Sequence, residues 1–242
     1  MINDMENDLV QKQKQDIELT KLAYSYSQEE YSHENIINIL SQNDEIKKQI
    51  CIINLKKLNS QAEADLLISN LTNHPTPVRE VTSYKILELC PEFSRYFQSE
   101  KHLDIFLAGI IDINPSVSRN VVDILEFAEN KQYCLNAIKP KISELNKEIS
   151  EIPKNKSYMA NKKNFSLYWY LEALYVFLKS PEPDEEIVDI IDLCSQSNEY
   201  TIREKCAKIV SLFQNSTNSK LNTIFERLQN DENFYVLNRL KS

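Results

Sequence analysis

Apolar residues recur along most of this chain at steps of three and four, the spacing that places side chains on one face of an α-helix. The clearest runs are Val117, Val121, Leu125 and Ala128, and then Ile202, Cys206, Val210 and Phe213. Short polar or proline-containing stretches separate such runs. The pattern predicts an all-α chain.

The helical runs recur in a way that predicts stacked helix pairs. We call the first apolar residue of the second helix in each pair its opener. The openers are Ile46, Val78, Val117, Leu167, Ile202 and Val236. Successive openers are 32, 39, 50, 35 and 34 residues apart by subtraction. First helices fit before them at 31–41, 61–72, 100–111, 131–150, 185–196 and 218–229. We expect about six antiparallel pairs over 31–242. A polar segment and a capping helix are expected over 1–30, because terminal repeats must cover an open end. Tyr24, Tyr26 and Tyr31 are expected to belong to this cap over the first repeat.

Helix-boundary signals support these ranges. Prolines expected between helices are Pro75, Pro77, Pro91, Pro115, Pro153, Pro181 and Pro183. Pro140 is the exception and predicts a break or restart within 131–150. Ser60 and Glu63 have the spacing of a capping box. The acidic residues 184–186 suit the first turn of a helix because they oppose its dipole.

Three of the openers share a further feature: an arginine follows the β-branched residue by one or two positions. These pairs are Val78 and Arg79, Val117 and Arg119, and Ile202 and Arg203. With small residues a turn later, the pattern resembles the second helix of a HEAT repeat. The resemblance implies a right-handed α-α superhelix, a HEAT-like solenoid, in which the arginine joins a polar ladder with an acidic residue of the preceding turn. Tetratricopeptide repeats have a similar period and rank second, because their Trp, Leu-Gly, Tyr and Pro positions are not reproduced.

The amino-acid composition excludes several classes of fold and binding site. The chain has 1 Gly in 242 residues, Gly109, where average usage of about 7% would give many more. Tight hairpins and phosphate-binding loops need glycine, so their usual forms are excluded. Hydrophobic residues make up 42%, enough to bury a core.

The cysteines and the lack of long apolar stretches point to one compartment. Five cysteines, an odd number, are widely spaced and mostly in apolar helix positions: Cys51, Cys90, Cys134, Cys194 and Cys206. They predict buried free thiols in a reducing environment. No signal peptide or membrane span is expected from the apolar pattern. We therefore expect a cytoplasmic protein without a membrane partner.

No constellation of residues predicts catalysis. His33, His74 and His102 lack the spacing of a zinc helix motif, and no serine lies in a nucleophile elbow. Paired acids such as Asp189 and Asp192 fit solvated helix faces. We expect no catalytic residue, no metal and no cofactor, and so a non-enzymatic interaction scaffold or adaptor for a partner protein or peptide.

Two other functions stay open. HEAT-like DNA glycosylases have a similar length, but they hold DNA in a cationic groove, and this chain has a net charge of −8. Arg79, Arg119 and Arg203 fit turn packing better than phosphate contacts, so nucleic-acid binding is not expected. The third possibility is a structural subunit of a larger assembly. The sequence does not predict the oligomeric state.

The fourth pair stands out as the place for binding. It contains a basic insertion at 153–164 and an aromatic second helix. The insertion is either part of a binding face or a tolerated surface loop. The candidate binding residues on the concave second-helix face are Trp169, Tyr170, Lys205, Lys208, Asn120 and Asp123. Alternatively, a helix with neighbours on both sides buries more than one stripe, and Trp169 and Tyr170 then belong to the core.

Overall fold

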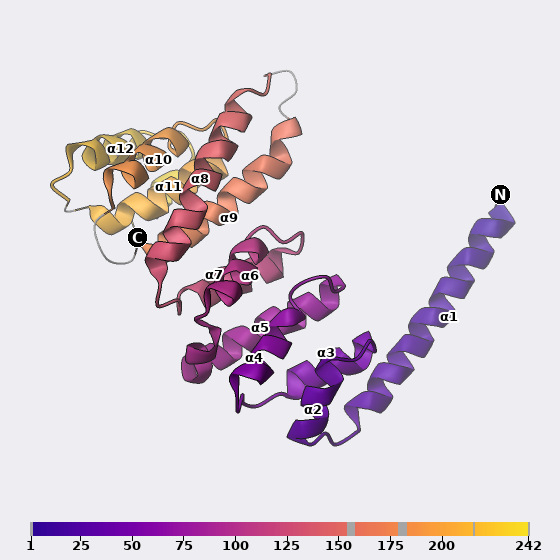
Figure 1. The fold of residues 1–242 in the computed structure, drawn as a ribbon. Coiled ribbons are helices and arrows are strands. Elements are labelled where there is room, and N and C mark those ends of the chain that lie inside the picture. Colours follow the sequence, from indigo (N-terminus) through magenta and orange to yellow (C-terminus); the bar gives the residue numbers. More distant parts are fainter. Residues whose placement is uncertain (1, 154–157, 179–182, 215, 242) are drawn as a thin grey trace. The chain divides into compact units, whose positions relative to one another are not determined.

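The computed structural model describes residues 2–153, 158–178, 183–214 and 216–241, and within these ranges every regular element is helical (Figure 1). The prediction of an all-α chain is confirmed for this part of the protein. The chain divides into two compact units, residues 1–96 and 97–242. That division lies within the segment predicted as one solenoid, and each unit is described by itself.

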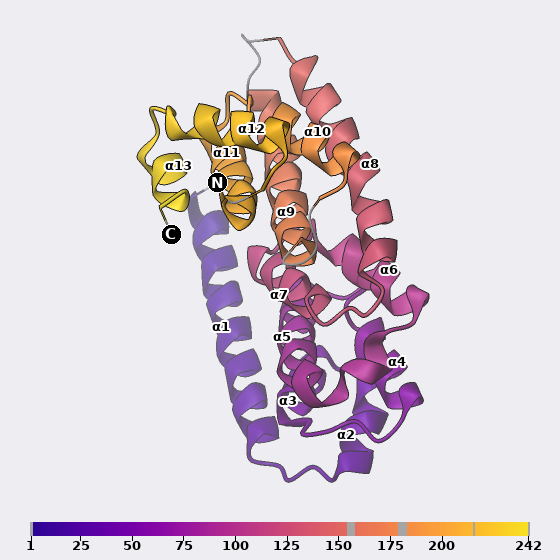
Figure 2. The same ribbon diagram turned by 90° about the vertical axis from the view of Figure 1, so that its left-hand side faces the viewer.

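The first unit contains two helix pairs preceded by a long helix. Its elements are α1 (Ile2–Ser27), α2 (His33–Leu40), α3 (Glu45–Asn54), α4 (Gln61–Ser69) and α5 (Thr76–Phe93). Helix α2 packs against α3 and α4, and α5 packs against α3 and α4. The first helices of the pairs therefore adjoin each other in one layer, and the second helices adjoin each other in another (Figure 2).

Helix α1 occupies the segment where a capping helix was expected. Its last turn packs on α3, where the Tyr26 hydroxyl donates to Asp44 Oδ2 at 2.8 Å and the Lys47 ammonium lies 4.8 Å from the Tyr26 ring centre. The side chains of residues 11–22 are exposed, and Figure 1 shows this part of α1 away from α2–α5. Among the side chains of α1 that the structure describes, those at its C-terminal end cover the first pair.

The second unit contains four helix pairs. After a 3-10 turn at the unit boundary, η1 (Ser94–Phe97), its elements are α6 (Glu100–Gly109), α7 (Pro115–Leu125), α8 (Lys131–Ser150), α9 (Asn161–Phe177), α10 (Glu185–Cys194), α11 (Tyr200–Val210), η3 (Ser211–Phe213), α12 (Ser219–Gln229) and α13 (Phe234–Arg239). Along the first layer, α6 contacts α8, α8 contacts α10, and α10 contacts α12. Along the second layer, α7, α9, α11 and α13 adjoin in the same order. Each expected helix of the six pairs is present, with ends within a few residues of the predicted ranges.

The turns inside the pairs are built with side-chain acceptors in place of glycine. In three of these turns, a polar side chain accepts a hydrogen bond from the backbone N–H of the N-cap residue, which follows it by two positions in the chain. The side chain of that N-cap residue accepts in turn from the backbone N–H two positions further along the chain. The acceptor and cap residues are Asp112 and Asn114, Ser197 and Glu199, and Asp231 and Asn233. These local bonds satisfy N–H groups that a helix start leaves without partners.

Four prolines depart from their expected places, and Pro181 lies outside the described residues. Pro77 and Pro115 were expected between helices but lie in the first turns of α5 and α7, where a helix tolerates proline.

Helix α8 continues through Pro140 without a break, and Pro91 lies within the last turn of α5. A proline removes one backbone bond from a helix. In α8 the buried side chains of Leu135, Ile138 and Ile142 lie on either side of the proline, so packing against the neighbouring helices holds the helix together.

The expected capping box is present in a modified form. Ser60 Oγ accepts from the Glu63 N–H, as predicted, but the Glu63 carboxylate accepts from the N–H of Asn59 at 2.8 Å. Asp184 is the N-cap of α10, and two further acids follow it in the first turn, as predicted. Asp189 and Asp192 do not simply face solvent: they pair with Lys220 and Arg227 of α12.

Two of the three repeated arginines, Arg79 and Arg203, bind turns. Arg203 donates to the carbonyls of Ser197 and Asn198, and its Nε and Nη2 donate to Asp231 at 2.6 and 3.1 Å. Arg79 donates to the carbonyl of His74 in the turn before its own helix. The acid that meets Arg203 belongs to the turn of the following pair, whereas the resemblance implied the preceding one. The apolar partners of the motif, Val78, Val117 and Ile202, are buried, and Arg119 is exposed.

Replacing Arg203 with alanine tests this turn contact. The variant leaves the nearly buried Asp231 carboxylate without its cation, so we expect a loss of about 2 kcal/mol in the free energy of unfolding, or roughly 4–8 °C in the thermal midpoint. The hydrogen bond from Arg203 lowers the pKa of Asp231. Its contribution is therefore present at neutral pH and is lost as the pH falls below the ordinary range of Asp, about 4, so the deficit must shrink in acid.

The control for Arg203→Ala is Arg119→Ala, which removes an exposed arginine from the matching repeat position. Circular dichroism melts at neutral and acidic pH measure both. Equal losses for the two variants, or a deficit that is unchanged in acid, would contradict the assignment.

Candidate functional site

The two aromatic residues expected on the binding face lie in the core. Trp169 is 7% exposed and Tyr170 is 8% exposed, and burial raises the pKa of the Tyr170 hydroxyl. Helix α9 packs against α7, α8 and α11, so it buries several sides at once. The structure thus corrects the expectation of exposed anchors and favours the alternative, in which both residues belong to the core.

Trp169 contacts two other rings of its own helix. It meets Tyr168 and Phe165 edge to face, with ring centres 5.3 and 6.3 Å apart. Its indole Nε1 is buried and has no hydrogen-bond partner among the described residues. Burying such a donor is costly, so the apolar contacts of this side chain must offset that cost.

The two candidate lysines join α11 to α9 through a residue that the sequence did not single out. Lys205, only 5% exposed, lies 2.5 Å from Glu172 Oε2, and Lys208 pairs with the other carboxylate oxygen. Lys205 Nζ lies 4.3 Å from the Tyr168 ring centre, and Lys208 Nζ lies 4.0 Å from that of Tyr175. These cations therefore tie two neighbouring helices together, and Lys205 offers no free surface to a partner.

The charges of this cluster stabilise one another. Burial by itself raises the pKa of Glu172, but the two ammonium groups outweigh it, so the pKa lies below its ordinary value. Burial likewise lowers the pKa of Lys205, and the Glu172 carboxylate outweighs that effect and raises it. Both partners are therefore charged at neutral pH.

The remaining candidates, Asn120 and Asp123, lie on α7. Asn120 is half-buried and Asp123 is exposed. Of the six predicted binding residues, the structure brings Lys205 and Lys208 to one carboxylate and places Trp169 and Tyr170 in the core.

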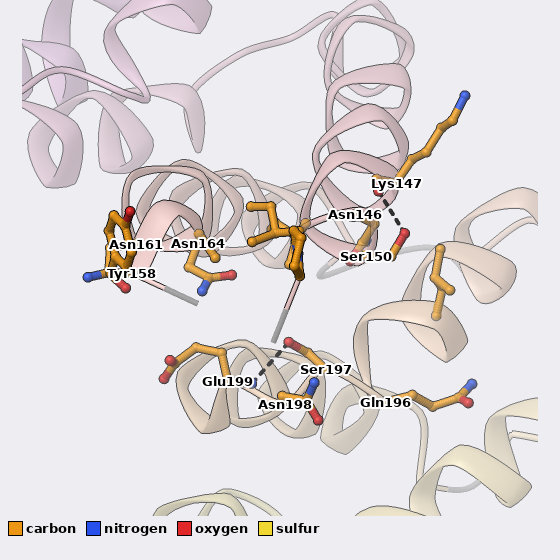
Figure 3. Close-up of a pocket in the computed structure, with 15 residues that line it drawn as sticks. Asn146, Lys147, Ser150, Tyr158, Asn161, Asn164, Gln196, Ser197, Asn198 and Glu199 are labelled. Carbon is orange, nitrogen blue, oxygen red and sulfur yellow. Dashed lines mark hydrogen bonds between the residues drawn. The ribbon is translucent and has the colours of Figure 1, made fainter. Parts of the chain in front are cut away.

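One hollow of the second unit lies elsewhere, at the turn edge between the fourth and fifth pairs. It has a volume of about 980 Å³ and lies between the end of α8, the start of α9 and the turn from α10 to α11 (Figure 3). We call it the amide groove. Its lining residues are Asn146, Lys147, Ile149, Ser150, Ile152, Pro153, Tyr158, Ala160, Asn161, Asn164, Leu193, Gln196, Ser197, Asn198 and Glu199.

Eight of the fifteen residues that line the amide groove carry a neutral hydrogen-bonding side chain, and five are apolar. Asn161, Gln196 and Asn198 are exposed, while Asn164 Oδ1 is buried and has no partner among the described residues. Lys147 is the one basic lining residue, and Figure 3 shows its ammonium end pointing away from the hollow. Amide side chains can donate and accept, which suits a peptide backbone.

Part of the groove comes from the insertion predicted at 153–164. The wall contains Pro153, Tyr158, Ala160, Asn161 and Asn164 of this segment, whereas Lys154 to Ser157 lie outside the described residues. Residues 161–163 belong to α9 and not to a loop, and Lys163 pairs with Glu148 of α8 at 2.5 Å. The long interval between the third and fourth openers was the sequence signal for this place. The opposite wall, residues 193–199, carried no such signal.

Metal and membrane features can be stated for the described residues. No cluster of three or more His, Cys, Asp or Glu side chains there could hold a metal ion. No described helix is long and apolar enough to span a bilayer. All five cysteines are free and buried.

Comparisons with known proteins do not identify a family for this chain. No known protein family matches the chain, and none of the curated proteins is similar to it. Among solved structures, an engineered protein is similar at 11% identity over 88% of this chain and 97% of that chain, with a TM-score of 0.47. A likeness at that level carries no argument.

Replacing Trp169 with alanine tests its place in the core. We expect a loss of about 3 kcal/mol or more, because the variant leaves a large cavity between α9 and its neighbours. A circular dichroism melt measures it, with Tyr158→Ala as the control at an aromatic residue that is 69% exposed. A Trp169 variant that melts with the wild type would place this side chain on the surface.

Replacing Glu172 with glutamine tests the charge cluster. The variant leaves the buried Lys205 ammonium without a carboxylate, so we expect a loss of about 3 kcal/mol at neutral pH. Because the pKa of Glu172 is lowered, the deficit must shrink as the pH falls below the ordinary range of Glu, about 4.

Two further variants test whether the effect of Glu172→Gln comes from the unpaired cation. Adding Lys205→Met must recover part of the stability, because it removes the stranded cation. Glu226→Gln, at an exposed position of α12, is the matched control. If Glu226→Gln costs as much as Glu172→Gln, the cluster has no special role.

Proposed function

We propose that this chain is a HEAT-like α-solenoid, a right-handed superhelix of about six antiparallel pairs, that binds a partner protein or peptide without catalysing a reaction. Two layers of helices in each unit, each helix contacting its neighbours in order, support the solenoid. The arginines that bind turns support the likeness to HEAT repeats. The family itself stays a proposal.

The amide groove is the observation that carries the binding function. Its volume suits a peptide segment, and its exposed amide groups can hydrogen-bond to a peptide backbone at any residue type. Amides do not titrate, so they supply neither a general acid nor a general base. The neutral lining also suits a peptide better than the phosphates of nucleic acid, which need clustered cations.

A cytoplasmic location belongs to the same proposal. The five free cysteines are buried helix residues, a use of cysteine that fits a reducing compartment.

Selection from a displayed peptide library on the full chain tests the function. We expect wild-type protein to enrich peptides whose affinity falls at least about tenfold, or roughly 1.4 kcal/mol, in the variant Gln196→Glu/Asn198→Asp. Both substitutions keep the side-chain shape at exposed groove positions and add negative charge.

The matched control is Gln42→Glu/Asn43→Asp, the same chemical change at exposed residues of the α2–α3 turn. The control must keep wild-type affinity. The proposal fails if no enriched peptide depends on the groove, or if the chain shifts a labelled DNA duplex with the steep salt dependence of phosphate binding.

A further inference from the structure

Another hollow of the second unit contains one of the predicted binding residues, Lys208. Its volume is about 420 Å³, which is within the range of pockets that hold small ligands. It lies among the last turns of α9, α11 and α13 and the η3 turn. We call it the basic pocket. Its lining residues are Tyr175, Lys208, Ser211, Leu212, Gln214 and Arg239.

Two of the described residues that line the basic pocket are cations, and none of them is an acid. The Lys208 ammonium pairs with Glu172 and lies over the ring of Tyr175. Arg239 Nε lies 2.8 Å from Glu204 Oε1. Neither carboxylate belongs to the lining, so the charged groups that a ligand meets in this pocket are positive.

The charges beside the basic pocket do not cancel. Glu172 is the carboxylate partner of both Lys205 and Lys208, so two positive charges against one negative charge leave these three side chains with a net charge of +1. Lys205 is buried and Lys208 is half-buried, so water screens this charge less than it does at an open surface. A singly charged anion in the pocket offsets the surplus.

The size of the surplus selects the kind of anion. A phosphate monoester carries about −1.5 to −2 at neutral pH, which exceeds the surplus, whereas a carboxylate carries a single negative charge. The planar guanidinium of an arginine such as Arg239 also matches the geometry of a carboxylate. The basic pocket therefore suits a carboxylate better than a phosphate.

Apolar surface lies next to these cations. Leu212 is 38% exposed in the pocket, and the ring centre of Tyr175 lies 4.0 Å from Lys208 Nζ. A ligand that fills the pocket thus needs an apolar group close to its carboxylate. The last residue of a peptide has this arrangement, because its carboxylate and its side chain are bonded to the same carbon atom. A side-chain carboxylate of Asp or Glu lacks such an apolar neighbour.

We propose that the basic pocket binds the C-terminal carboxylate of a peptide or protein chain that ends in an apolar residue. Lys208 and Arg239 bind the carboxylate, and Leu212 and the ring of Tyr175 pack against the last side chain. This rests on the proposed function for the kind of partner. It assigns that partner a second site, whose lining residues are all different from those of the amide groove.

Fluorescence anisotropy with the full chain tests the ligand. The probe is the peptide Gly-Ser-Gly-Ser-Ala-Leu, with a neutral dye at its N-terminus and a free C-terminal carboxylate. One comparison peptide has the same sequence and a C-terminal amide. A second ends in Ala-Glu with a C-terminal amide, so its carboxylate belongs to a side chain. We expect the probe to bind saturably and both comparison peptides to bind at least about tenfold more weakly.

Two variants locate the site. Arg239→Gln and Lys208→Gln must each weaken the probe at least about fivefold, because each removes one cation from the pocket. Lys220→Gln is the matched control and must leave the affinity unchanged. The side chain of Lys220 is 46% exposed and that of Arg239 is 44% exposed, and both pair with a carboxylate. Circular dichroism melts show which variants fold, and Arg239→Gln carries the test if the half-buried Lys208→Gln is unstable.

A purely structural role of the two cations predicts the opposite results. Lys208 and Arg239 lie in the last turns of α11 and α13, where cations oppose the helix dipole. If that is their whole role, the probe does not bind saturably or binds no better than its amide, and the inference is overturned. Equal binding of the Ala-Glu amide, or equal weakening by Lys220→Gln, overturns it as well.

The groove variant Gln196→Glu/Asn198→Asp separates this inference from the proposed function. It must leave the affinity of the probe unchanged, because neither residue lines the basic pocket. A probe that loses affinity in this variant binds the amide groove, which overturns the basic pocket and leaves the proposed function standing. If the library selection fails while the probe binds as expected, the amide groove is overturned and the basic pocket stands.

Discussion

The structure of the second unit depends on one constraint: a helix in the middle of a layered stack has to bury several of its sides at once. Helix α9 shows the effect most fully, since it packs against its pair partner α8 and against α7 and α11 in its own layer. Trp169 and Tyr170 are buried in addition to its leucine stripe, and Lys205 of the next helix is buried as well.

This constraint explains which predictions from the sequence succeeded. The positions of the helices could be predicted from local signals, namely the spacing of apolar residues, the side-chain caps and the prolines. Each of these signals involves residues that lie close together in the sequence. The stripe of Leu167, Leu171 and Leu174 is buried as its spacing indicated. The prediction of a helix break at Pro140 was wrong, because the effect of a proline on an isolated helix does not account for packing against neighbouring helices. Tertiary packing outweighs one missing backbone bond.

The candidate site was harder to predict for the same physical reason. Whether Trp169 is core or surface depends on what lies beside α9, and no pattern within the helix states it. The amide groove joins residues from two turns about forty positions apart, such as Asn161 and Asn198. The long interval between openers pointed to one wall. The other wall consists of ordinary polar turn residues, which become a site only through their placement.

The cluster at Glu172 has a consequence for how this sequence can change over time. One carboxylate serves two lysines of the neighbouring helix, so the three positions are not equivalent. Loss of Lys208 still leaves a neutral pair, whereas loss of the carboxylate leaves two cations together, one of them buried. Substitutions at these positions are coupled, so their order matters. An apolar residue at 205 makes a later change at 172 less costly, whereas the reverse order passes through a less stable intermediate. Related sequences that lack an acid at this position are thus expected to lack the buried lysine as well.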